Sequence, residues 1–133
     1  MKHRRAPLPN RVAARWLLAP IFVLSGSEVF AEPGARTAKA AGLGIPNPEL
    51  ATRANGAFMA VAGVALGLGI APRLAATGLI VSMIPTTFAG HAFWEEQNPK
   101  TASAQRVQFL KNLGLIGGLL LVATERRSRA EPV

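Results

Sequence analysis

Ionisable and amide side chains gather at the ends of apolar segments in this sequence. His91 and Glu95 close one such segment at a spacing of four residues, and Lys111 and Asn112 stand near the start of the next. On a continuous helix His91 and Glu95 share one face, so an imidazole–carboxylate hydrogen bond between them is feasible. Such a pair could transfer protons to a quinone or an acid near a membrane surface. The alternative is a structural polar plug that fixes the helix ends.

Residues of this kind are predicted to meet in one polar mouth at the outward end of the protein. Glu28 and Lys111 are drawn toward lipid, because their apolar segments are otherwise too short to cross a bilayer, which takes about twenty residues. An unpaired charge deep in the bilayer costs about 3 kcal/mol. We therefore expect Glu28 to pair with Lys111, or Lys111 to pair with Glu95. The full set is Glu28, Arg53, Asn55, His91, Glu95, Lys111 and Asn112.

The sequence indicates neither a metal centre nor a familiar catalytic motif. The chain has no cysteine, which excludes disulfides, thiolate nucleophiles and cysteine-ligated zinc or iron–sulfur clusters. His91 and Glu95 alone provide too few ligands for a metal. No nucleophile-elbow, zinc-protease, phosphate-loop or dinucleotide-binding pattern occurs. We therefore assign no catalytic residue and no metal, and we expect the protein not to be catalytic on its own.

Four apolar segments position the polar residues, at about 12–31, 54–71, 74–94 and 107–124. Half of the residues are hydrophobic and 17% are charged, a composition typical of a membrane protein with several spans. The first segment also resembles a cleavable signal peptide. Its apolar run continues into Glu28 and three further spans follow, which favours a retained helix. The sequence predicts one domain, residues 1–133, that forms an all-α integral membrane four-helix bundle.

Small residues recur every three or four positions in three of these segments and predict close helix packing. They are Gly56, Gly63, Gly67, Gly78, Ser82, Gly114 and Gly118. Trp16, Phe93 and Trp94 stand near span ends, where aromatic rings act as interfacial anchors.

The charge distribution predicts the orientation and the surface that the protein contacts. The net charge is +8, and the basic residues gather at both ends of the chain with no aromatic-rich polar surface between them. Contact with anionic membrane lipid is therefore the simpler interpretation, and nucleic acid is not expected as a partner. Positive residues near span ends favour the cytoplasmic side, so both termini are predicted to be cytoplasmic, an N-in/C-in topology.

Four stretches together resemble the DoxX family of small four-helix bacterial membrane proteins, most of all its actinobacterial branch. They are RWLLAPIFVLSG, RANGAFMAVAGVALGLG, PRLAATGLIVSMIPTTFAGHAFWE and RVQFLKNLGLIGGLLL. The segments HAFWE and FLKN are the specific part of this resemblance. It implies a multi-pass protein of the bacterial plasma membrane that is linked with redox systems, and it supplies no settled catalytic residues.

Three functions are compatible with these observations. The first is an accessory or anchoring subunit of a redox-related membrane complex that binds a quinone or lipid at its outward polar mouth and contacts partner proteins. The second is an oxidoreductase subunit that handles quinone protons through His91 and Glu95. The third is a structural or chaperone-like membrane protein that packs against other helices through its small-residue seams. Quinone is the one cofactor that we consider.

Overall fold

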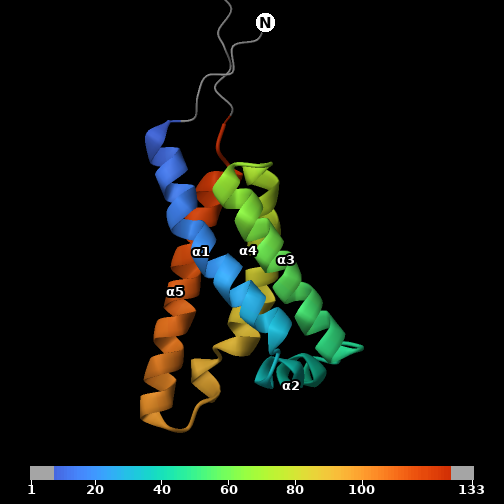
Figure 1. The fold of residues 1–133 in the computed structure, drawn as a ribbon. Helices are drawn as coiled ribbons and strands as arrows, with labels where there is room; N and C mark the ends of the chain where they lie inside the picture. Colours follow the sequence, from blue (N-terminus) through green and yellow to red (C-terminus); the bar gives the residue numbers. More distant parts are fainter. Residues whose placement is uncertain (1–7, 127–133) are drawn as a thin grey trace, which may run out of the picture.

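The structure is a computed structural model that describes residues 8–126, and every regular element in this range is helical (Figure 1). The long helices are α1 (Pro9–Ala31), α3 (Pro48–Leu68), α4 (Pro72–Gly90) and α5 (Pro99–Ala123). A short helix, α2 (Ala35–Gly42), links α1 to α3, and a 3-10 turn, η1 (Phe93–Glu95), links α4 to α5. Four segments of the described chain are long and apolar enough to cross a membrane. The prediction of an all-α protein with four membrane-spanning helices is confirmed.

Proline marks the start of every long helix. Pro9, Pro48, Pro72 and Pro99 each occupy the first turn, where a missing N–H removes no helical hydrogen bond. The side chain of Asn98 also caps α5, accepting hydrogen bonds from the backbone N–H groups of Lys100 and Thr101. As a result α5 begins at Pro99, whereas the span predicted from hydropathy begins at residue 107. Two turns of the polar segment that was expected to be a loop are helical.

The chain turns sharply between α3 and α4. Gly69 ends α3 with a positive φ of 71°, and Ala71 precedes α4 with a φ of 42°. The N–H of Ile70 reaches back to the carbonyl of Ala65 at 2.8 Å, which satisfies a carbonyl of the last helical turn. Three residues, 69–71, therefore separate two membrane-length helices.

The four long helices run alongside one another, and the start of α5 extends beyond the ends of α1 and α4 (Figure 1). The start of α1, the α3–α4 turn and the end of α5 lie together at one end, which we call the terminal end. The end of α1, all of α2, the start of α3, η1 and the start of α5 lie at the other, which we call the α2 end. The described chain thus enters and leaves the bundle on the same side.

Helices α1 and α3 make the closest contact of the bundle, and glycine allows it. A Cβ on Gly26 would lie 2.6 Å from the carbonyl oxygen of Gly56, and a Cβ on Gly56 would lie 2.7 Å from that of Gly26. Both distances are too short for any side chain, so the backbones meet directly. Gly56 was predicted to pack in this way, whereas Gly26 was not among the residues singled out.

The other predicted small residues differ in their surroundings. Positions 63, 67, 78 and 118 face side chains of neighbouring helices. Gly114 has open space around it within the described chain, so the expected seam on α5 is only half formed. The core lies between these helices and contains the fully buried Phe22, Leu66, Leu79 and Leu119. Most large apolar side chains elsewhere point outward, as expected for a surface that contacts lipid.

Candidate functional site

A series of hydrogen bonds follows α4 from the middle of the bundle toward the α2 end. The hydroxyl of Ser82 donates to Oδ1 of Asn55 on α3 at 2.7 Å. Five residues further along α4, the hydroxyl of Thr87 accepts a hydrogen bond of 3.0 Å from the amide of Asn112 on α5. Ser82 is buried and Thr87 is completely so. These two bonds pair Oδ1 of Asn55 and Nδ2 of Asn112, and they join α4 to α3 and to α5.

The third bond of the series involves His91 and replaces the hydrogen bond that was expected between His91 and Glu95. Helix α4 ends at Gly90, so His91 lies outside the helix and Glu95 belongs to the separate turn η1. The expectation that both share one helical face is therefore wrong. Instead, Nδ1 of the half-buried His91 lies 2.7 Å from Oε1 of Gln105 on α5, and the imidazole N–H donates to that amide oxygen. Gln105 is available because α5 starts early enough to include it.

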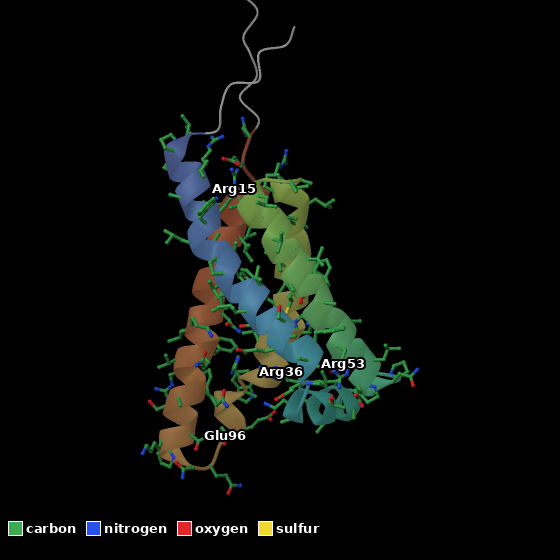
Figure 2. All side chains as sticks on the ribbon, in the orientation of Figure 1. Arg15, Arg36, Arg53 and Glu96 are labelled. Atoms are coloured by element: carbon green, nitrogen blue, oxygen red, sulfur yellow. The ribbon has the colours of Figure 1, made fainter. Side chains whose placement is uncertain are left out.

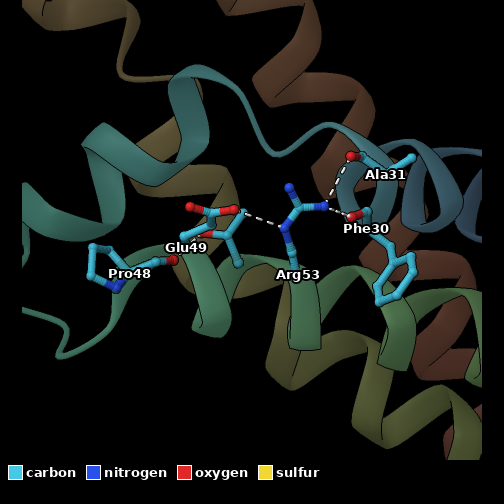
Figure 3. Close-up of polar contacts among 6 residues, drawn as sticks. Phe30, Ala31, Pro48, Glu49 and Arg53 are labelled. Carbon is cyan, nitrogen blue, oxygen red and sulfur yellow. Dashed lines mark hydrogen bonds and ion pairs between the residues drawn. The ribbon is translucent and has the colours of Figure 1, made fainter.

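Arg53 joins the start of α3 to the end of α1 (Figure 3). Its Nη1 donates to the carbonyl oxygens of Phe30 and of Ala31, the latter at 2.9 Å. Its Nε contacts the carboxylate of Glu49 at 3.0 Å, one helical turn away. The last carbonyls of a helix lack intrahelical partners and carry partial negative charge, so the guanidinium caps α1. Arg53 is thus bonded both to the end of α1 and to Glu49 on its own helix.

Glu28 and Lys111 do not form the predicted pair. Both are exposed, and the ammonium of Lys111 donates instead to Oε1 of Gln108 at 2.6 Å, three residues earlier on α5. No ion pair links Lys111 to Glu28 or to Glu95 within residues 8–126. The physical reason is that a lysine on the outer face of a helix can extend its flexible chain along that helix toward the interface. It needs no partner inside the bundle.

A pocket of about 400 Å³ opens at the α2 end, between α2, α4 and η1. Most of its lining residues are apolar, among them Leu43, Pro85 and Phe88, while Lys39 and Glu95 supply charged groups. The ammonium of Lys39 donates to the carbonyl oxygen of Gly90 at 2.9 Å, which holds α2 against the end of α4. Of the seven residues predicted to form one polar mouth, Glu95 alone lines this pocket.

An aromatic cluster adjoins the pocket and includes two of the predicted anchors. Phe93 and Trp94 on η1 pack edge to face at 5.1 Å between ring centroids. Phe109 of α5 contacts both rings, and Phe88, which lines the pocket, contacts Phe109 at 5.4 Å. The third predicted anchor, Trp16, lies near the terminal end and is 66% exposed. Aromatic side chains therefore stand near both ends of the bundle, as interfacial residues of membrane proteins do.

Sequence reasoning missed the residues that complete the site. Lys39 lies in α2, between the first and second predicted spans, and Gln105 lies between the third and fourth. The Asn98-Pro99 pair signals a helix start and could have placed Gln105 on α5. Nothing in the sequence signals the contact between Lys39 and Gly90, which depends on how α2 folds back. Within the described residues no group of three or more His, Asp or Glu side chains could hold a metal.

Comparison with known proteins identifies one relation. A family model described as DoxX matches residues 11–92, which covers α1 to α4 and more than half of the 133-residue chain. Helix α5 and the turn η1 lie beyond the matched range. No curated protein and no solved structure matches the chain.

Proposed function

The chain belongs to the DoxX family and is a multi-pass membrane protein, and on this premise we propose that it is an accessory subunit of a redox-related complex. In this proposal it resides in the bacterial plasma membrane with both termini in the cytoplasm. It binds a quinone in the pocket between α2, α4 and η1, and partner proteins carry out the catalysis.

The pocket carries the proposal. A volume of about 400 Å³ falls within the range of small-molecule sites, which are mostly apolar with a few polar groups that fix the ligand's orientation. A quinone has an apolar ring, an apolar tail and two carbonyl oxygens, and this combination matches the lining. Phe88 lines the pocket and belongs to the adjoining aromatic cluster, so it offers an aromatic face for the ring.

Lys39 and Glu95 supply the polar contacts. An ammonium group has three N–H donors, and Lys39 uses one of them on the carbonyl of Gly90. The remaining donors can bind a ring carbonyl oxygen, and the Glu95 carboxylate can accept a hydrogen bond from a ring hydroxyl. The quinone would supply the redox chemistry when bound. The lining can donate and accept hydrogen bonds and can pack against the quinone ring. We therefore assign to it the binding and orientation of that ring.

A quinone titration tests the proposal. In the Trp16→Phe variant, Trp94 is the sole tryptophan, and it lies 6.3 Å from Phe88 between ring centroids. We expect a short-chain quinone added to delipidated protein in nonionic detergent to quench Trp94 fluorescence with saturation at one quinone per chain. Lys39→Met should weaken binding by about tenfold, since a hydrogen bond from a charged group contributes about 1.5–3 kcal/mol. Ala89→Phe, which fills the pocket while keeping Lys39, should abolish saturation.

Arg36→Met is the matched control. Arg36 is also a basic residue of α2 and is exposed, but it does not line the pocket, so its removal should leave quinone affinity unchanged. Equal losses in Lys39→Met and Arg36→Met, or quenching that never saturates, would overturn the proposal. His91→Ala should also retain affinity, because His91 is bonded to Gln105. Loss of quinone in His91→Ala would instead favour the oxidoreductase hypothesis based on His91.

One observation favours a second function, assembly of other membrane helices. Gly114 and Gly117 on α5 have nothing within 4 Å in the described chain, and the adjacent Leu110 and Leu121 are exposed. A smooth helix face of this kind lets another helix approach closely. If assembly is the function, Gly117→Leu should lower recovery of a cross-linked partner while the thermal unfolding midpoint of the isolated protein stays unchanged.

A further inference from the structure

Arg15 is buried at the terminal end, and no carboxylate of residues 8–126 pairs with it. It lies on the inward stripe of α1, one turn from the buried Ala19, and it is 8% exposed. Its Nε is inaccessible and has no hydrogen-bond partner among residues 8–126. Figure 2 shows Arg15 at the level where α1 begins and α5 ends. Arginine keeps its proton under all ordinary conditions, so a positive charge is held there.

Two other arginines of this end, Arg11 and Arg73, already have partners among the described residues. The guanidinium of Arg11 contacts the carboxylate of Glu125 at 2.6 Å, and Nε of Arg73 donates to the carbonyl oxygen of Ala123 at 3.1 Å. Arg15 instead approaches Gly69 at the end of α3, where a Cβ would stand 3.2 Å from its Nη2. The negative end of a helix offsets a cation only in part, so the arginine retains capacity for an anion.

An apolar groove leads away from this arginine along the surface between α1 and α3. It has a volume of about 410 Å³, and its lining includes Trp16, Pro20 and Leu24 from α1 and Val64 and Leu68 from α3. Trp16 is the chain neighbour of Arg15, and Leu68 is that of Gly69. The end of the groove nearest the terminal end is therefore lined by the chain neighbours of the two residues that meet at the guanidinium, Arg15 and Gly69.

From this juxtaposition we infer that the terminal end holds an anionic phospholipid, with its phosphate on Arg15 and one acyl chain in the α1–α3 groove. Charge complementarity selects the headgroup, because arginine binds phosphate through two parallel N–H donors. The apolar lining selects a chain rather than a free anion. The site lies at the opposite end from the quinone pocket and is independent of it.

Trp16 provides the readout, because it lines the groove. In the Trp94→Phe variant it is the sole tryptophan. We expect brominated phosphatidylglycerol, added to delipidated protein in nonionic detergent, to quench Trp16 at lower concentration than brominated phosphatidylcholine, by about fivefold or more. That factor corresponds to about 1 kcal/mol for one basic residue at an anionic surface.

Arg15→Met should bring the two lipids to equal quenching, and Arg15→Lys should keep part of the preference. Arg73→Met is the matched control, an arginine of the same end that is exposed, and it should retain the preference. An equal loss of lipid preference in Arg73→Met would show that the preference comes from the overall positive charge of this end, and would overturn the proposed site. Inorganic phosphate or glycerol phosphate that displaces the lipid at equal concentration would show a free-anion site and overturn the lipid assignment.

Two further measurements separate binding from folding. Val64→Phe, which narrows the groove, should weaken quenching, while Val61→Phe, one turn away and outside the groove, should not. The thermal midpoint of Arg15→Met without anionic lipid should equal or exceed that of the parent, because removing an unpaired buried charge carries no loss. Added phosphatidylglycerol should raise the midpoint of the parent alone. A lower midpoint for Arg15→Met together with an intact lipid preference would identify Arg15 as a structural residue and overturn the inference.

Discussion

The amide of Asn112 on α5 donates a 3.0 Å hydrogen bond to the fully buried hydroxyl of Thr87 on α4. This bond joins the two helices, and it involves the same helix, α4, as the bond between Ser82 and Asn55. A polar group inside a membrane bundle stabilises the structure only when it finds such a partner.

We predict that Asn112 and Thr87 are energetically coupled. Thr87→Val and Asn112→Leu should each lower the free energy of unfolding, and the double variant should lose less than their sum. The expected coupling is about 0.6 kcal/mol and at most about 1.7 kcal/mol, the range for hydrogen bonds between membrane helices. Reversible unfolding in mixed micelles measures it. Thr86→Val with Asn112→Leu is the control pair, because Thr86 bonds its own helix; full additivity at Thr87 would show that the bond contributes nothing.

The contact between Gly26 and Gly56 should tolerate no side chain. Gly56→Val places carbon atoms against the backbone of α1, so α1 and α3 must separate. We expect a loss of about 1–3 kcal/mol or more, the usual cost of overpacking, measured as a lower thermal midpoint in detergent. Gly114→Ala has open space and a better helix former, which is favourable by up to about 1 kcal/mol. Similar effects of the two substitutions would contradict the close crossing.

Arg53 should stabilise the end of α1 specifically. Arg53→Met leaves the carbonyls of Phe30 and Ala31 to water, so we expect faster hydrogen exchange in the last turn of α1 and a loss of about 1 kcal/mol, since the side chain is only partly buried. Arg106→Met is the control, because Arg106 contacts a ring face of Phe93 and caps no helix. Unchanged exchange at 28–32 in Arg53→Met would contradict the capping role.

The predicted N-in/C-in topology can be tested directly because the chain has no cysteine. Single cysteines at the exposed positions Lys100 and Arg126 report the α2 end and the terminal end. A membrane-impermeant maleimide should label Lys100→Cys in intact cells and should label Arg126→Cys only after permeabilisation. The reverse pattern would place the quinone pocket on the cytoplasmic side.

Hydropathy and helix-start signals account for most of the fold. Four apolar segments predict four long helices, and the prolines that flank them stand at the first turns. Helix boundaries were less predictable, because a polar segment continues a helix when a cap such as Asn98 starts it early. The 3-10 turn after Gly90 was also not visible in the sequence, since the pattern from residue 74 to residue 94 is uninterrupted.

The sequence identifies many of the polar residues of the site, but it does not predict which residues form hydrogen bonds with one another. The polar residues of the helices were identified, but the bonds between helices depend on how the helices are rotated and offset: Asn55 bonds Ser82, and His91 bonds Gln105. Exposed charges such as Lys111 have many energetically similar arrangements, so spacing alone does not select a partner. The burial of Arg15 against Gly69 follows from the tight α3–α4 turn, which the spacing of the apolar segments does not describe.

That turn also has a consequence for how the protein is made. Only three residues separate α3 from α4. The two helices therefore cannot insert into the lipid one after the other, because this connection is too short for one helix to stay outside the bilayer while the other is inside. They must partition into the bilayer as a single hairpin during synthesis. The orientation of either helix then dictates that of the other, and lengthening this connection should be the simplest way to produce misoriented chains.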